Sequence, residues 1–145
     1  MSHGAHGHGE SSNKTIAIFI SILALCLAIA ETMAKSAQTD GLGYNIKAAD
    51  TWAFFQAKTI RRTTIEAMAD AMEVDARLAR DPATKEILEK RIADWRKTAA
   101  RYRSEPETGE GSNELMRKAR EHEGKRDLAL AKYHHYEVSS AALQI

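Results

Sequence analysis

The hydrophobic pattern of the chain begins with one continuous apolar run, Thr15 to Ala34, in which Glu31 is the single charged residue. Lys14 and Lys35 flank this run, which contains neither proline nor glycine. Twenty residues of α-helix rise about 30 Å, which is the thickness of the hydrocarbon core of a bilayer. The pattern therefore predicts a transmembrane helix over residues 14–38.

A secretory signal peptide is the alternative interpretation of the same run. Lys14 would supply its basic flank, and Ala28-Ile29-Ala30 resembles an A-x-A cleavage site. However, the apolar portion from Thr15 to Ala30 is as long as the longest signal-peptide cores. Its length favours the membrane anchor.

Residues 1–13 combine glycine, serine and histidine with almost no apolar side chains. Such a segment buries too little surface to order itself, so we expect a flexible tail. His3, His6 and His8 would give this tail imidazole ligands for a divalent metal. Metal binding by these histidines is the alternative to a solvated tail.

Behind the apolar run, Asp40-Gly41-Leu42-Gly43 predicts a turn or flexible joint. A long helix is then expected over residues 44–80, because small and apolar side chains recur there every three or four residues. Small side chains in such a stripe let a neighbouring helix come close. The stripe consists of Ala49, Ala53, Ala57, Ile60, Thr64, Ala67, Met68, Ala71 and Leu78.

Two more helices are predicted, over residues 82–104 and 113–145. Asp81 suits the cap of the first and Pro82 its first helical position, and Ser112 is the expected cap of the second. Between them, Ser104 to Gly111 reads as an exposed acidic loop. The helix over 82–104 has a coiled-coil-like 4-3-4-3 spacing of Leu88, Ile92, Trp95, Ala99 and Tyr102.

The last predicted helix carries two adjacent apolar stripes. One contains Leu115, Ala119, His122, Ala129, Tyr133, Tyr136 and Leu143, and the other contains Leu128, Ala131, His135, Val138, Ala142 and Ile145. Charged residues cease after Glu137. We therefore expect this helix to return to the membrane.

The charge balance of the chain argues against nucleic acid as a partner. The chain has 21 Lys and Arg against 20 Asp and Glu, intermixed after the apolar run. Such a mixture creates no positive field for DNA or RNA. Cys26 is the single cysteine and lies in the apolar run, so it has no disulfide partner within the chain.

No catalytic pattern is found in the sequence. Phosphate loops and G-x-S-x-G elbows are missing, and no histidine of the helices follows a Glu-x-x-His pattern that would indicate a di-metal centre. We therefore expect a protein that is not an enzyme and that has no cofactor and no metal site in its helices.

The order of these segments resembles a bacterial membrane-protein family called domain of unknown function 4337. The most specific part is the block Asp50-Thr51-Trp52-Ala53-Phe54-Phe55-Gln56-Ala57-Lys58, and the late Tyr133-His134-His135-Tyr136-Glu137 adds to it. The resemblance implies an N-terminal transmembrane helix, a helical middle domain and further transmembrane helices after Ile145, in the bacterial inner membrane. It implies no catalytic residues. On this basis the chain is a shorter relative, a truncated form or part of a longer protein.

Together these patterns predict an all-α protein with an N-terminal transmembrane helix and an antiparallel helical hairpin or three-helix coiled-coil-like domain. The expected function is non-enzymatic: a membrane-anchored interaction or scaffold protein that self-associates or serves as accessory subunit of a larger membrane complex. A membrane-tethered metal-handling protein is the alternative. The candidate interaction residues are Trp52, Ala53, Phe54, Phe55, Ala57, Ile60, Leu88, Ile92 and Trp95.

Overall fold

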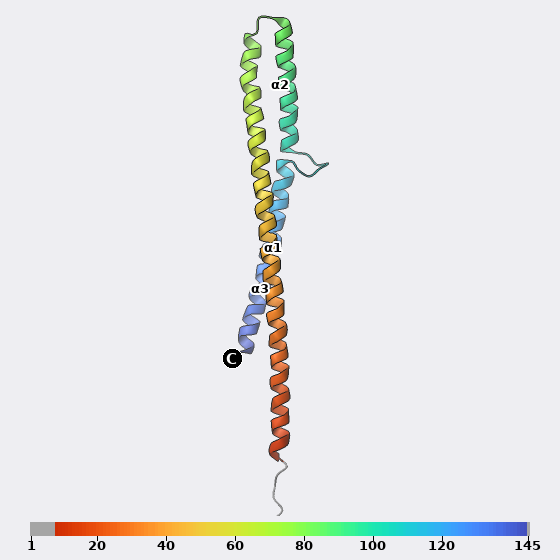
Figure 1. Ribbon diagram of the computed structural model, residues 1–145, viewed down its shortest axis with the longest axis vertical. Helices are drawn as coiled ribbons and strands as arrows, with labels where there is room; N and C mark the ends of the chain where they lie inside the picture. The colour runs from red at the N-terminus through yellow and green to blue at the C-terminus, as the bar shows by residue number, and fades with distance from the viewer. Residues whose placement is uncertain (1–7, 145) are drawn as a thin grey trace, which may run out of the picture. The chain divides into compact units, whose positions relative to one another are not determined.

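The computed structural model describes residues 8–144, and the side chains of residues 13–144. Three helices make up this range: α1 (His8–Leu78), α2 (Pro82–Arg103) and α3 (Ser112–Leu143). The long helix α1 packs against α2 and α3 (Figure 1). The all-α class is therefore confirmed, and the helices predicted over residues 14–38 and 44–80 are parts of one helix.

The chain divides into two compact units. We call residues 44–124 the middle unit, which holds the later part of α1, all of α2 and the first part of α3. Residues 1–43 and 125–145 form the other one, which we call the terminal unit.

The predicted turn at Asp40-Gly41-Leu42-Gly43 is wrong, because α1 runs through it without interruption. A glycine costs a helix only about 1 kcal/mol relative to alanine, and packing easily outweighs this. Gly41 is buried, and a methyl group at this position would lie 3.0 Å from Leu130 Cδ2. The glycine therefore allows α3 to approach α1 closely.

The segment predicted as the N-terminal tail, residues 1–13, overlaps α1. α1 begins at His8, so residues 8–13 of the expected tail are helical. Extending an existing helix by one residue is much easier than starting a new one. The other residues of the predicted tail, among them His3 and His6, lie outside the described residues.

In the middle unit, α1 packs through a seven-residue repeat that alternates steps of four and three. Every one of these positions is buried or half-buried. Such a repeat keeps one face of a helix against its partner, as in coiled coils. This packed seam consists of Tyr44, Ala48, Thr51, Phe55, Lys58, Arg62, Ile65, Ala69, Met72 and Ala76.

Helix α2 returns antiparallel beside α1, and the 4-3-4-3 spacing predicted for it is confirmed (Figure 1). Ile92 and Ala99 are buried, and Leu88 and Trp95 pack on a core formed with Ala69 and Ala76. The cap is as predicted: Asp81 accepts a hydrogen bond from the Thr84 N–H at 2.9 Å, and Pro82 is the first residue of the helix. These features produce the predicted hairpin.

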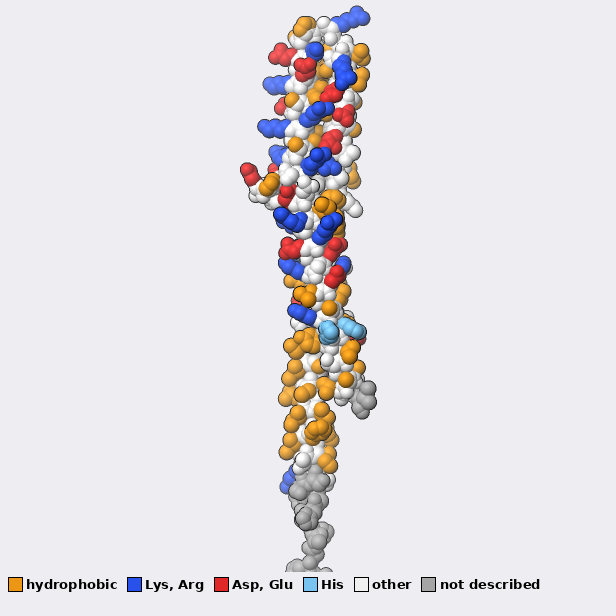
Figure 2. Space-filling model, turned by 180° about the vertical axis from the view of Figure 1, so that it is seen from behind, with side chains coloured by type: hydrophobic (Ala, Val, Ile, Leu, Met, Phe, Trp, Pro, Cys, Tyr) orange, Lys and Arg blue, Asp and Glu red, His pale blue; other side chains and the backbone are white. Residues whose placement is uncertain are grey.

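In the terminal unit, α1 meets α3 through small side chains. Ala30, Ala34, Ala37 and Gly41 are buried on α1, and Ala129 and Ser140 on α3. Upstream of this contact, α1 exposes large apolar side chains, which dominate the surface of this unit in Figure 2. Ile16, Ile18, Phe19, Ile20, Ile22, Leu25 and Ile29 are all more than half exposed.

The two stripes predicted for α3 have different outcomes. In the first, Leu115, Ala119 and Ala129 are buried and the two tyrosines half-buried, although Leu143 is exposed. The second stripe is exposed at Leu128, Ala131, His135, Val138 and Ala142, and Ile145 lies outside the described residues. One stripe therefore suffices for the packing on α1.

Candidate functional site

The predicted interaction residues fall into two groups in the structure. Leu88, Ile92 and Trp95 lie in the packing between α2 and α1. By contrast, Ala53, Ala57 and Ile60 are exposed on the opposite side of α1. The two groups therefore do not form one surface.

The aromatic residues of this prediction are divided in the same way. Trp52 is half-buried, and its Nε1–H donates a hydrogen bond of 2.9 Å to Glu123 Oε1 on α3. The ring of Phe55 meets Trp52 edge-on, with 5.3 Å between the centroids. Phe54 is 39% exposed. Trp52 and Phe55 therefore hold α3 against α1, and Phe54 faces away from that contact.

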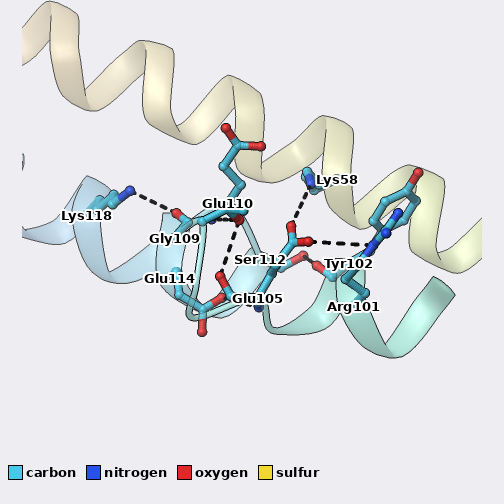
Figure 3. A network of polar contacts seen from close by, with 10 residues as sticks. Lys58, Arg101, Tyr102, Glu105, Gly109, Glu110, Ser112, Glu114 and Lys118 are labelled. Atoms are coloured by element: carbon cyan, nitrogen blue, oxygen red, sulfur yellow. Dashed lines mark hydrogen bonds and ion pairs between the residues drawn. The ribbon is translucent and has the colours of Figure 1, made fainter. Parts of the chain in front are cut away.

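Sequence reasoning missed Lys58, which lies at the junction between α2 and α3. Its side chain is only 9% exposed, and its Nζ lies 3.9 Å from Glu105 Oε2 in the loop between the two helices (Figure 3). The same Nζ lies 4.9 Å from the ring centroid of Tyr102 and 5.7 Å from that of Phe54. The ammonium group is therefore held by one carboxylate and two ring faces.

The loop at this junction is fixed by Glu114 from the first turn of α3. Its carboxylate accepts hydrogen bonds from the Ser104 hydroxyl at 2.7 Å and from the Glu105 N–H at 3.1 Å (Figure 3). The expectation that Ser112 caps α3 is wrong, because its hydroxyl donates to the Tyr102 carbonyl at 3.0 Å. Ser112 thus satisfies a carbonyl in the last turn of α2, where the helix itself supplies no donor.

These bonds give the junction a pH dependence. The Ser104 hydroxyl, and then the Glu105 N–H, hold the pKa of the Glu114 carboxyl below its ordinary value of 4.5. The folded state therefore binds fewer protons than the unfolded state, so stability increases with pH in this range. The contribution of Glu114 is fully present above pH 4.5 and is lost as the pH falls through the lowered pKa.

We predict that Glu114→Gln unfolds at lower urea concentration than the parent at pH 7, because the amide nitrogen cannot accept the bond from Glu105. The difference between the two proteins should shrink as the pH falls from 4.5 to 3, since the parent then loses the same interaction. Urea unfolding followed by circular dichroism measures this, with Glu107→Gln in the exposed loop as control. A difference that stays constant down to pH 3 would contradict the assignment.

The exposed residues of α1 in the middle unit form a second seven-residue repeat. We call it the outward seam: Ile46, Asp50, Ala53, Ala57, Ile60, Thr64, Ala67, Ala71, Val74 and Leu78. All ten side chains are exposed. At 3.5 residues per turn, this seam lies about 150° around the helix from the packed seam.

The outward seam differs in chemistry from an ordinary solvated helix face. Ile46, Ile60, Val74 and Leu78 are 53–73% exposed, and Phe54 and Met68 lie beside them at 39% and 48%. The exposed face of α2, by contrast, is rich in Lys, Arg, Asp and Glu, with Ile87 as its exposed large apolar residue. The outward seam is therefore more apolar than the exposed face of α2, although it includes Asp50 and Thr64.

The predicted metal-binding histidines of the N-terminal tail are His3, His6 and His8. His3 and His6 lie outside the described residues, as does the side chain of His8. Within the described range, no three His, Cys, Asp or Glu side chains gather as metal ligands would. The metal-handling alternative therefore stays a prediction.

Comparison with known proteins confirms the family. The family model described as Domain of unknown function (DUF4337) matches residues 12–145, which is nearly the whole chain. No curated protein and no solved structure matches the chain. The resemblance noted in the Asp50–Lys58 block thus extends over all three helices. The chain belongs to the DUF4337 family.

Proposed function

We propose that this protein is a non-enzymatic, membrane-anchored interaction module whose outward seam on α1 takes a further helix. The observation that carries the proposal is the second seven-residue repeat of α1, which is exposed along its whole length and apolar except at Asp50 and Thr64. Water is a poor partner for this surface, because each large apolar side chain gains about 1.5–3 kcal/mol on burial. Packing of another helix would supply that burial.

The small core of the middle unit supports the same proposal. Among the described residues no large side chain is fully buried, and the buried part of the packed seam is mostly alanine. A hairpin with so little buried apolar surface gains stability when a further chain covers it. The charges of the Arg96–Glu73 and Arg103–Glu66 pairs are exposed or half-exposed, so they add little.

Membrane anchoring is the second part of the proposal, and it rests on the exposed apolar side chains of α1 in the terminal unit. Asn13–Leu78 is the one helix of the described chain that is long and apolar enough to cross a membrane. The most apolar stretch of it is not buried by the rest of the protein. A bilayer would cover those side chains, which lie within the predicted span of 14–38.

Two charged residues of the terminal unit, Glu31 on α1 and Glu137 on α3, indicate where the edge of that bilayer would lie. Gly41 packs on Leu130, Glu31 lies ten residues before Gly41, and Glu137 lies seven residues after Leu130. In antiparallel helices these two carboxylates are within about one turn of the same height. Beyond them α1 is uncharged back to Thr15, and α3 is uncharged to its end.

The proposal is tested by expressing the full chain in bacterial membranes. We expect the protein to stay with the membranes during an alkaline wash. After gentle detergent extraction, native mass spectrometry should show masses above that of the monomer. Ile60→Glu should reduce the associated form strongly, because it places a carboxylate in the buried interface. Ile60 is 66% exposed in the single chain, so this change leaves the fold intact.

Ile87→Glu is the matched control, since Ile87 is 67% exposed but lies on α2, away from the outward seam. It should leave the association unchanged. A parent protein that is monomeric in native membranes and in the mildest extraction would contradict the interaction module. Release of the chain by the alkaline wash would contradict the anchor.

A further inference from the structure

We infer that the outward seam of the middle unit binds a second copy of this chain in antiparallel orientation, with Ile46 of each copy opposite Leu78 of the other. This inference rests on the proposed function and names its partner. It concerns the middle unit alone. The outward seam extends over residues 46–78 of α1, which are 33 residues and about 50 Å of helix.

The size of the side chains along the outward seam is nearly symmetric about residue 62. Ile46 and Asp50 are followed by two alanines, a central Ile60 and Thr64, two more alanines, and finally Val74 and Leu78. When the seam is reversed onto itself, Ile46 meets Leu78, Ala53 meets Ala71, Ala57 meets Ala67, and Ile60 meets Thr64. Asp50 meets Val74, a side chain of similar size, so this pair matches in size but not in charge. A twofold-symmetric dimer requires a self-complementary surface, because both partners contribute the same residues in opposite directions.

The residues along one edge of the seam show the same symmetry in their chemistry. At seven-residue intervals this edge carries Lys47, Phe54, Arg61, Met68 and Asp75. In the antiparallel pairing Lys47 lies beside the partner's Asp75, and Phe54 beside the partner's Met68, each twice in the dimer. Opposite charges and apolar pairs therefore come together at both ends. The two Arg61 side chains meet near the axis, a single like-charge contact that solvent screens.

A parallel arrangement of two copies lacks this complementarity. In register, it would place Asp50 opposite the partner's Asp50 inside the seam. It would also bring Asp70 beside the partner's Asp75, because flanking positions five residues apart meet in parallel coiled coils. Each edge of the dimer would then hold one Asp70–Asp75 pair of carboxylates, and the two Asp50 carboxylates would face each other within the seam. The charge pattern therefore selects the antiparallel orientation.

Cysteine cross-linking of the full chain in mild detergent tests the orientation, after Cys26→Ala removes the native thiol. We expect a disulfide when Ala53→Cys chains are mixed with Ala71→Cys chains under oxidation, and little from either variant alone. Lys97→Cys on the exposed face of α2 is the control and should not cross-link. Efficient cross-linking of Ala53→Cys with itself would indicate the parallel arrangement and overturn the inference.

Charge exchange provides a second readout that does not depend on cysteine. Lys47→Glu alone and Asp75→Lys alone should each weaken self-association, by about two- to fivefold for exposed pairs. A mixture of the two variants should recover it as a heterodimer, because each interface then holds two opposite-charge pairs. Sedimentation velocity measures both effects. Variants that associate like the parent would overturn the register.

The two proposals fail in different ways. A purified parent chain that is monomeric at all concentrations overturns the second copy as partner. If the chain extracted from membranes then still carries a foreign subunit, and Ile60→Glu removes that subunit, the interaction module stands with another partner. If Ile60→Glu changes nothing in either experiment, both proposals fail.

Discussion

Gly111→Ala should lower the stability of the protein by about 2–3 kcal/mol, the cost of a steric conflict together with lost hydrogen bonds. Gly111 is buried directly before α3. A methyl group on it would lie 2.5 Å from the Glu105 backbone nitrogen and 2.6 Å from Ser104 Cα, and it would also strike the Glu114 carboxylate. Backbone atoms cannot turn aside as a flexible side chain can, so the loop itself must shift.

The measurement is urea unfolding of the full chain in mild detergent, followed by helical circular dichroism. Gly124→Ala is the matched control, because a methyl group at that position on α3 meets nothing within 4 Å. In the interior of a helix it should add about 0.5–1 kcal/mol to the stability. The two glycine substitutions should therefore have opposite signs. A Gly111→Ala protein as stable as the parent would show that the loop is not fixed as described.

Helix α1 has two seven-residue repeats, and the sequence predictions selected residues from the one that is exposed. Sequence reasoning selected Ala53, Ala57 and Ile60 because they are apolar, and the structure leaves them exposed. The packed seam instead contains Lys58 and Arg62 at half-buried or buried positions. Hydrophobicity alone favours the more apolar face of a helix, even when the other face meets the partner.

Helix α2 was predictable because it has one apolar face and clear end signals. Asp81 and Pro82 define its start in the sequence, and the loop after Arg103 holds Pro106. The bonds within that loop were not predictable, since they join residues that only the folded chain brings together. Ser112 shows this: its hydroxyl binds the Tyr102 carbonyl of the preceding helix in place of its own helix start.

Lys58 lies on the packed seam of α1, but the sequence alone does not single it out. Counting in sevens from Ala48 gives Phe55, Arg62, Ala69 and Ala76, and the positions three residues after these include Lys58. The repeat does not by itself identify the packed face, because the outward seam has the same spacing. It also does not reveal the contact with Glu105, because the register of α2 and α3 on α1 depends on the loop that joins them.

Lys58→Glu is the substitution for which we expect the largest loss of stability, about 3–5 kcal/mol. The new carboxylate would lie in a nearly buried position, facing Glu105 and two aromatic rings whose faces repel negative charge. Lys97→Glu is the control on the exposed face of α2 and should change the stability by no more than about 0.5 kcal/mol. Urea unfolding at pH 7 compares the two proteins.

Lys58→Met separates the charge of this side chain from its packing. Methionine keeps most of the apolar stem, and Glu105 retains Arg101, whose Nε lies 3.6 Å from it. We therefore expect Lys58→Met to stay within about 1 kcal/mol of the parent, because a buried ion pair contributes little more than an apolar replacement. Adding Glu105→Lys to Lys58→Glu should recover part of the loss, since the reversed pair restores the attraction. If Lys58→Glu were as stable as Lys58→Met, the ammonium group would not be held at the junction.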